Sequence, residues 1–284
     1  DNTDKDDKRG KTDTGFIATA YYYNAARLTA RAADIIGETA DKVKYEKLAG
    51  EIFDGLRSEY FSYDGKIKSD TQTAYALAVV FGLCDKKIAG KHLYDKLSEN
   101  GMKLSTGFVG TAFLLDALTS AGYIKEAFSL MLGEDIPGWL YSVNMGATTV
   151  WERWDSVLPG GNIRDGEMNS LNHYAYGSVL SWVYKSIVGI RPDETAGGFD
   201  RAVIAPVPDK RLDKVYGEYD SVVGKYAVGY AISGAETHMK IIIPYLGEAK
   251  FVTPDGYKVK TVDGQVSGYE NIILKGGTHS IILV

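Results

Sequence analysis

The sequence predicts an α+β protein of several domains, in which a helical domain comes first and a domain of β-strands follows. Up to about residue 190, apolar residues recur at the spacing of an α-helix. After Gly197-Gly198 they alternate at the spacing of a β-strand. The chain has 284 residues, which is enough for two hydrophobic cores. Helices and strands that are segregated along the chain favour separate domains over a mixed sheet.

Residues 1–12 are predicted to be a linker or disordered, because they form a run of solvated charges. They contain no initiator Met and no apolar signal segment, so this N-terminus predicts no cellular location. The run ends abruptly at a helix start, which suggests a chain cut from a longer polypeptide.

Residues 13–192 are predicted to form helical hairpins in series, joined by short turns that contain Gly. Asp13 or Thr14 is the expected N-cap of the first helix, and Asp70 that of the third. The expected helices cover residues 14–37, 41–61, 70–82, 88–100, 108–121, 123–132 and 172–187. Such hairpins indicate an α/α bundle or toroid, and about seven helices leave one without a partner.

Residues 197–284 are predicted to form a compact, antiparallel β-sandwich or jelly roll. The expected strands are short and cover residues 202–205, 215–219, 226–230, 239–243, 250–252, 258–260, 271–274 and 279–283. The segments Pro254-Asp255-Gly256 and Lys275-Gly276-Gly277 are predicted to be turns between strands.

Composition and motifs exclude several classes of function. The net charge is −5 and the basic residues are spread among acids, so a nucleic-acid partner is not expected. No apolar run approaches the ~20 residues that span a bilayer, so no membrane partner is expected. The four His never form a close pair, and no Gly-rich phosphate loop follows a strand, so neither a metal nor a cofactor is expected.

The candidate site lies in the long segment 135–171, since all four Trp fall between residues 139 and 182. Glu152 lies between Trp151 and Trp154, with Trp139 upstream. Indole rings stack on the C–H faces of sugars, and a carboxylate among aromatic side chains is suited to acid/base catalysis. The alternative is a Trp-rich core around a salt-bridged Glu152, without catalysis.

Polar residues near the expected start of the last helix extend this site. His173 is interpreted as a ligand for a sugar hydroxyl or water, or alternatively as a cap or core residue, and Asn172 adds a polar group. Asp155 is a candidate for orienting water or sugar. Arg153 either keeps Glu152 ionised or pairs with Asp155 in a structural role.

Several of these blocks resemble the C-terminal portion of bacterial α-L-rhamnosidases. They are Thr-Thr-Val-Trp-Glu-Arg-Trp-Asp (148–155), Met-Asn-Ser-Leu-Asn-His-Tyr-Ala-Tyr-Gly (168–177), Gly-Ile-Arg-Pro (189–192), Ser-Asp-Thr-Gln-Thr-Ala-Tyr-Ala (69–76) and Thr-Gly-Phe-Val-Gly-Thr (106–111). The resemblance runs from about residue 13 to the end. It implies part of an (α/α)6 toroid followed by a C-terminal β-sandwich.

The resemblance also implies a reaction, the inverting hydrolysis of terminal α-L-rhamnosides without a metal. By the same resemblance Glu152 matches the general base that activates water, and His173 matches a residue that contacts the rhamnose. The family's general acid belongs to earlier helices of the barrel, so a fragment that lacks it is expected. The expected partner is a rhamnose-containing glycoside, and exposed helix faces would suit a homo-oligomer or the remainder of the same polypeptide.

Two alternatives from other classes remain open. One is a non-catalytic fragment that binds carbohydrate or serves a structural role. The other is a different toroidal inverting glycosidase or a phosphorylase, in which phosphate replaces water. A phosphorylase would need an anion pocket near Glu152, for which the sequence offers few residues.

Overall fold

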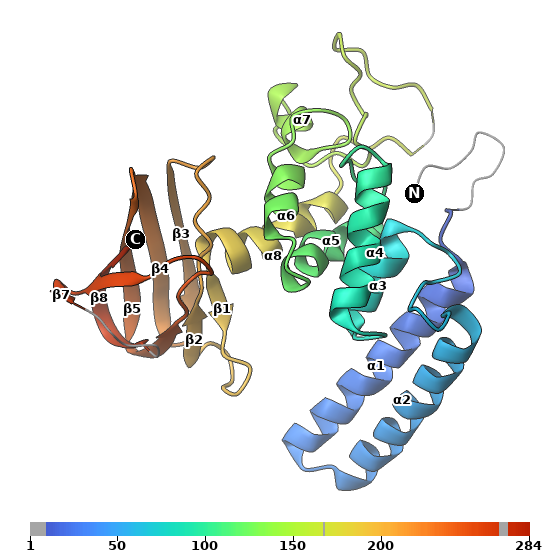
Figure 1. The fold of residues 1–284 in the computed structure, drawn as a ribbon, viewed down its shortest axis with the longest axis horizontal. Helices are drawn as coiled ribbons and strands as arrows, with labels where there is room; N and C mark the ends of the chain where they lie inside the picture. Colours follow the sequence, from blue (N-terminus) through green and yellow to red (C-terminus); the bar gives the residue numbers. More distant parts are fainter. Residues whose placement is uncertain (1–9, 167, 267–271) are drawn as a thin grey trace. The chain divides into compact units, whose positions relative to one another are not determined.

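The computed structural model describes residues 10–166, 168–266 and 272–284. The chain divides into two compact units, a helical unit up to Val179 and a second unit over Leu180–Val284 (Figure 1). The α+β class, with helices before strands, is therefore confirmed. The division at Val179 precedes the predicted domain limits of 192 and 197. The reason is that the end of the last helix belongs to the second unit, where Val188 is part of the core of the sheet.

The helical unit consists of hairpins, as predicted. Its described helices are α1 (Thr14–Ile36), α2 (Thr39–Tyr60), α3 (Gln72–Phe81), α4 (Lys86–Glu99), α5 (Phe108–Ser120), α6 (Ile124–Met131) and the short α7 (Trp139–Asn144). The six helices predicted before residue 133 are confirmed to within a few residues. The structure adds α7, which lies inside the segment predicted to be a long loop.

Local capping explains where the first helices begin and end. Oδ1 of Asp13 accepts a hydrogen bond from the Phe16 N–H at 2.8 Å, and Gly37 ends α1 in the left-handed conformation with φ of 83°. The predicted cap of α3 was wrong by one residue. Thr71 caps this helix by accepting from the Ala74 N–H at 3.2 Å, while the Asp70 carboxylate accepts from the Tyr75 hydroxyl at 2.7 Å.

Helix α3 forms the centre of the helical unit and packs against α4 and α5. Its small residues Ala74, Ala76 and Ala78 are fully buried, so its neighbours approach closely. Gln72, at its first turn, is 2% exposed and fixes the chain before α5. Its Oε1 accepts from the Ser105 N–H at 2.8 Å, and its Nε2 donates to the Lys103 carbonyl at 3.0 Å.

The predicted last helix, 172–187, begins later and is less regular than expected. It starts as a 3-10 turn at Ala175–Ser178, continues as α8 (Val179–Trp182) and ends as a π-helical turn at Val183–Val188. The prediction that the helix begins at Asn172 was wrong, because the His173 N–H donates to the Val150 carbonyl at 2.8 Å instead of starting a helix. The predicted stop before Gly189 is confirmed.

The second unit contains one hydrogen-bonded sheet in the described residues. Its strands are β1 (Ile190–Pro192), β2 (Arg201–Ile204), β3 (Lys214–Ser221), β4 (Gly224–Ser233), β5 (Glu236–Phe251), β6 (Val259–Val262), β7 (Gln265–Val266) and β8 (Ile272–Leu283). The order is β1-β2-β5-β8-β6-β7, with β4 also paired to β5 and β3 to β4. All pairs are antiparallel except β2–β5, which is parallel and so corrects the wholly antiparallel prediction.

Two pairs of predicted strands are in fact single long strands. Segments 239–243 and 250–251 both belong to β5, which ends one residue before the predicted limit of 252. Segments 272–274 and 279–283 both belong to β8; residue 271 lies outside the described residues. The register of β5 against β8 shifts between Ile243 and Glu248. Gly276 lies opposite this shift and is not in a turn. A Cβ there would come within 2.4 Å of the Tyr245 carbonyl oxygen.

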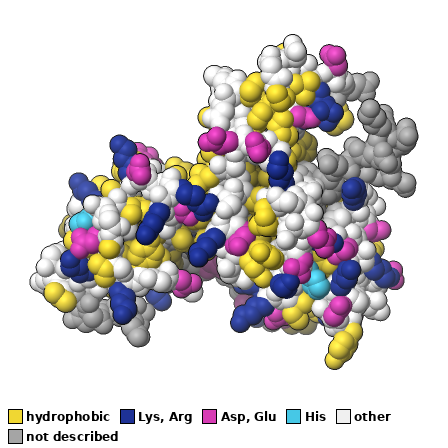
Figure 2. All heavy atoms as spheres, turned by 45° about the horizontal axis from the view of Figure 1, so that its top comes forward, with side chains coloured by type: hydrophobic (Ala, Val, Ile, Leu, Met, Phe, Trp, Pro, Cys, Tyr) yellow, Lys and Arg dark blue, Asp and Glu magenta, His cyan; other side chains and the backbone are white. Residues whose placement is uncertain are grey.

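Both halves of β5 and of β8 contribute to a single hydrophobic core. Ile241 and Phe251 from β5, and Leu274 and Ile281 from β8, are at most 2% exposed and belong to one cluster. The sheet therefore curls around its core, as in the predicted sandwich. On the face that Figure 2 shows, acidic and basic side chains are interspersed. Within the described ranges, no helix is both long enough and apolar enough to cross a membrane.

Candidate active site

Backbone hydrogen bonds hold the two predicted site segments side by side in the helical unit. The Glu152 N–H donates to the Ser170 carbonyl at 2.9 Å, and the His173 N–H donates to the Val150 carbonyl at 2.8 Å. The Thr149 hydroxyl donates to the Leu171 carbonyl. The Trp-Glu-Arg-Trp and Asn-His-Tyr blocks, which are distant in sequence, therefore form one local structure.

The carboxylate of Glu152 is half-buried and is oriented by a backbone amide. The Ser170 N–H donates to its Oε2 at 2.8 Å. In the part of the chain that the structure describes, Oε1 accepts no protein hydrogen bond, and neither oxygen is ion-paired. The alternative of a salt-bridged Glu152 in a Trp-rich core is therefore not supported. One oxygen is fixed in place while the other is available to a water molecule or a hydroxyl.

An aromatic cluster of Trp139, Trp154 and Tyr176 anchors the loop that carries Glu152. The Trp154 ring stacks on Tyr176, with centroids 3.8 Å apart and planes at 16°, and Trp139 meets Trp154 edge-on at 5.1 Å. The Trp139 indole N–H donates to the Tyr176 carbonyl at 2.9 Å. These contacts connect α7, the Glu152 loop and the 3-10 turn, so the cluster holds the loop rigid.

The tryptophans differ in how much of each is accessible. Trp139 and Trp151 expose only 8% and 6% of their surface, which favours a supporting role for them. Trp154 is half-buried, although its indole N–H is itself buried and has no partner among the described residues. Because more of its surface is accessible, Trp154 is the best placed of the three for direct contact with a ligand. The fourth tryptophan, Trp182, belongs to the core and was not predicted as a site residue.

Tyr176 is a buried member of the cluster and keeps its proton. Burial raises the pKa of the Tyr176 hydroxyl to about 12, and the nearby carboxylates of Asp155 and Glu152 raise it further while Arg153 lowers it. Because these charges act on Tyr176, the phenol shares the electrostatic environment of the candidate base. The phenol stays neutral at ordinary pH.

The carboxylate of Asp155 is held by two arginines. Its Oδ1 pairs with Nε of Arg153 at 3.3 Å, and its Oδ2 pairs with Nη1 of Arg164. The predicted structural pairing of Arg153 with Asp155 is therefore present. Arg164 comes from the far end of a small hairpin in which Val157 bridges to Ile163, so these ion pairs close that hairpin. This arrangement favours a supporting role for Asp155 over direct contact with a sugar.

Asn172 and His173 follow Ser170, whose backbone N–H and carbonyl both bond to Glu152. The Asn172 N–H donates to the Ser170 hydroxyl at 3.1 Å, and Asn172 is exposed. The His173 ring stacks on Phe108 with centroids 4.7 Å apart, and its Nδ1 accepts from the Ala175 N–H at 3.3 Å. In the neutral ring this bond places the proton on Nε2, which can then donate to a ligand.

Sequence reasoning missed the site roles of Ser170 and Phe108. Phe108 begins α5 and packs against both His173 and Tyr176. Its only signal was its place in the Thr-Gly-Phe-Val-Gly-Thr block, which gave the family resemblance but no role. Ser170 acts through its backbone N–H. Every residue except proline carries this group, so the residue type gave no signal.

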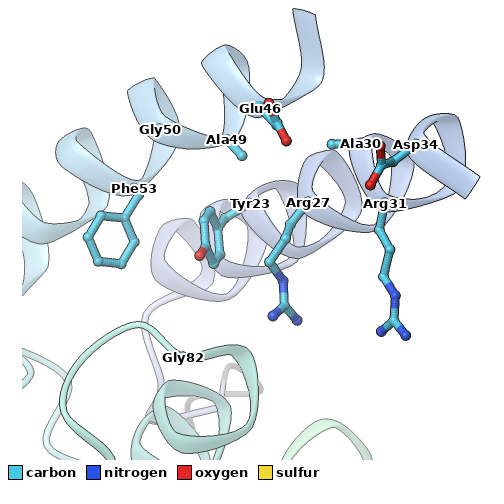
Figure 3. Close-up of a pocket in the computed structure, with 10 residues that line it drawn as sticks. All are labelled: Tyr23, Arg27, Ala30, Arg31, Asp34, Glu46, Ala49, Gly50, Phe53 and Gly82. Carbon is cyan, nitrogen blue, oxygen red and sulfur yellow. The ribbon is translucent and has the colours of Figure 1, made fainter. Parts of the chain in front are cut away.

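Two hollows lie elsewhere, and Glu152 lines neither. One, of about 550 Å³, lies between α1 and α2 (Figure 3). Figure 3 shows Arg27 and Arg31 extending from α1 away from α2. The other, also about 550 Å³, lies on the sheet of the second unit. Within the described ranges, no group of three His, Cys, Asp or Glu side chains could hold a metal ion.

Two known domain families match almost the whole chain, one after the other. Residues 1–187 match the bacterial α-L-rhamnosidase six-hairpin glycosidase domain, and residues 189–268 match the bacterial α-L-rhamnosidase C-terminal domain. The helical hairpins and the loop that carries Glu152 are thus part of a hairpin glycosidase domain. The chain belongs to the bacterial α-L-rhamnosidase family, which confirms the resemblance seen in the sequence blocks.

Individual relatives agree with this assignment. An α-L-rhamnosidase of Formosa agariphila is 35% identical over 241 residues, covering 83% of this chain and 26% of that protein. One of Streptomyces avermitilis is 39% identical over 217 residues, covering 75% of this chain and 21% of that protein. The chain therefore spans about a quarter of the length of the relatives it matches.

Two solved structures share the fold of almost the whole chain. The Streptomyces avermitilis α-L-rhamnosidase complexed with L-rhamnose superposes with a TM-score of 0.86 and 31% identity, over 99% of this chain and 27% of that one. The α-L-rhamnosidase of Aspergillus terreus superposes with a TM-score of 0.88 and 28% identity, over 98% and 31%. The helical hairpins with a C-terminal sheet thus share the fold of the matching part of these enzymes.

Proposed function

We propose that this chain provides the general base for inverting hydrolysis of terminal α-L-rhamnosides, and that Glu152 is that base. One observation carries the proposal. The Glu152 carboxylate is oriented by the Ser170 N–H, while its second oxygen is free of protein partners among the described residues. Such a carboxylate can hold a water molecule and accept its proton.

The reaction requires two carboxyl groups on opposite faces of the sugar. Glu152 removes a proton from water, and the water oxygen bonds to the anomeric carbon as the bond to the leaving oxygen breaks. A carboxylic acid on the other side donates its proton to the leaving oxygen. None of the acids in this chain is assigned that second role. By family resemblance it is expected from a part of the barrel that precedes the matched sequence.

The neighbours of Glu152 suit the handling of a rhamnose-containing glycoside. His173 belongs to the segment that pairs with the Glu152 segment and offers an Nε2–H donor, and the exposed Asn172 offers an amide. Trp154 presents an aromatic surface for the C–H face of the sugar ring. Trp139 and Asp155 support this loop through the contacts described above, and Trp151 is itself buried. No metal or cofactor is needed for this chemistry.

The test is Glu152→Gln in a full-length polypeptide that contains this chain. Glutamine keeps the shape and can still accept from the Ser170 N–H, but it cannot take a proton. We expect kcat on an aryl α-L-rhamnoside to fall at least about a thousandfold, with the melting temperature unchanged. Glu134→Gln, at an exposed glutamate outside the site, is the matched control and should retain full activity.

Three outcomes would contradict this assignment. A loss of less than about tenfold in Glu152→Gln would remove Glu152 from the role of base. Turnover that depends on added phosphate would instead identify a phosphorylase. Binding of L-rhamnose without turnover in the unaltered full-length protein would identify a carbohydrate-binding protein. The anomeric configuration of the first product, followed by NMR, tests inversion directly.

A further inference from the structure

The hollow on the second unit lies over strand β4, and its floor is made of small residues. Ala227, Gly229 and Ala231 alternate along β4 and therefore share one face of the sheet. Larger side chains of β3 and β5 stand on either side. The result is a trough of about 550 Å³ that follows the direction of β4.

Strand register places an exposed aromatic ring and two polar side chains in one row across this trough. Tyr216 pairs with Gly229, Gly229 with Lys240, and Lys240 with Ser280. Tyr216 is 66% exposed, and a Cβ at Gly229 would come within 3.2 Å of its ring. Glycine therefore lets the ring lie close against the floor while its other surface faces solvent.

The Tyr216 ring is fixed by its hydroxyl. This hydroxyl donates to Oε2 of Glu218 at 2.6 Å, and Oε1 of Glu218 pairs with Lys225 at 2.7 Å. An exposed aromatic side chain that is already ordered loses little conformational entropy when a ligand stacks on it. It is therefore preorganised as a flat apolar surface.

The lining combines apolar and hydrogen-bonding groups in the way that a sugar requires. Each hydroxyl of a sugar both donates and accepts, and the opposite ring face carries apolar C–H groups. The trough offers the Tyr216 ring and the side chain of Ile242 as apolar surfaces. Lys240 offers donors, and the Ser280 hydroxyl offers both a donor and an acceptor.

An extended peptide fits this face less well than a saccharide. Peptides commonly bind sheets by adding a strand to a free edge. Strand β4 is paired along its length to β3 on one side and to β5 on the other, so its backbone groups are occupied. A ligand over β4 must therefore be recognised by side chains alone.

We propose that this trough is a second saccharide-binding site, in which a pyranose ring stacks on Tyr216 above Gly229. Hydroxyls of the ring bind Lys240 and Ser280. The inference goes beyond the proposed hydrolysis, because none of these residues belongs to the candidate active site. The site would hold part of the glycan through the second unit, independently of the chemistry at Glu152.

The test is an NMR titration of the 284-residue chain carrying Glu152→Gln, with an L-rhamnose-terminated oligosaccharide as the probe. Amide signals of Gly229, Ala231 and Lys240 should shift on binding. Tyr216→Ala should weaken this binding roughly tenfold through loss of stacking, whereas Tyr216→Phe, which keeps the ring but loses its hydrogen bond to Glu218, should weaken it less. Ala231→Leu, which fills the trough at an exposed position, should also weaken it.

Tyr245→Ala is the matched control, since Tyr245 is 91% exposed on the same sheet but does not line the trough. The proposal is overturned if Tyr216→Ala, with unchanged circular dichroism, binds as tightly as Tyr245→Ala. It is also overturned if only signals near His173 shift, a result that would leave the proposed hydrolytic site intact. Conversely, shifts at β4 together with an active Glu152→Gln enzyme would retain this site and refute the proposed base.

Discussion

At the scale of single residues, the candidate site depends on which side-chain atoms already have hydrogen-bond or ion-pair partners in the protein. Asp155 carries a carboxylate as Glu152 does, but two arginines hold both of its oxygens, whereas Glu152 accepts only the Ser170 N–H from the described chain. Exposure separates the tryptophans, since Trp154 is half-buried, whereas Trp139 is buried and donates its indole N–H to Tyr176. Sequence alone predicted these candidate residues but could not rank them, because ranking depends on hydrogen-bond partners.

Tyr176 gives a prediction about alkaline stability. Burial raises its pKa to about 12, above the usual value near 10. Because the folded state holds this proton more tightly than the unfolded state, the stability from this group is complete below about pH 10 and is lost as the pH rises towards 12. We therefore expect Tyr176→Phe, which keeps the stack on Trp154, to lose less free energy of unfolding than the unaltered chain between about pH 9 and 11.

Urea unfolding at the two pH values measures this difference. Burial also raises the pKa of Tyr75 and Tyr230, so the Tyr176→Phe variant still loses some stability through these groups, and the unaltered chain serves as the reference. An equal loss in both proteins would mean that Tyr176 does not resist ionisation in the folded state.

At the scale of elements, helices were predicted more accurately than strands, and the reason is physical. A helix carries its own start and stop signals, as Asp13 and Gly37 do for α1. A strand boundary depends on a partner that is distant in sequence. The Lys275-Gly276-Gly277 segment has the composition of a turn, but β8 continues through it because β5 pairs on both sides of the register shift. Only the register reveals that the glycine accommodates a neighbouring backbone.

Gly276 therefore has a testable role in β8. Its φ is not in the left-handed region, so the cost of a side chain is steric alone, from the Tyr245 carbonyl 2.4 Å from the position of a Cβ. We expect Gly276→Ala to destabilise the second unit by about 1–3 kcal/mol, because rigid backbone must shift. Gly197→Ala, where a Cβ meets nothing within 4 Å, is the control and should have little effect. Similar melting temperatures for the two variants would disprove the close contact.

At the scale of the whole molecule, the order of domains and the family could be predicted from the sequence, while the irregular parts of the site could not. Helical and alternating spacing predicted the two architectures, and the Trp-Glu-Arg-Trp and Asn-His-Tyr blocks predicted the family. The site needed the structure because Glu152 and His173 lie in segments without regular secondary structure, where local patterns carry little information. Short α7 and the late start of the last helix arise from tertiary contacts of those same segments.

The proposed division of catalytic groups predicts how the 284-residue polypeptide behaves alone. It spans about a quarter of the length of its relatives, and the proposed mechanism takes only its base from this chain. Because inversion needs an acid to protonate the leaving oxygen, we expect the isolated polypeptide to show no measurable turnover of an aryl α-L-rhamnoside.

An acidic leaving group such as nitrophenol needs less protonation than an alkyl one, so a nitrophenyl glycoside is the more stringent substrate for this expected absence of turnover. Turnover of an alkyl α-L-rhamnoside that Glu152→Gln abolishes would place an acid within this chain, because an alkyl leaving oxygen needs that proton. Turnover that survives the substitution would mean that the chemistry resides elsewhere in the chain.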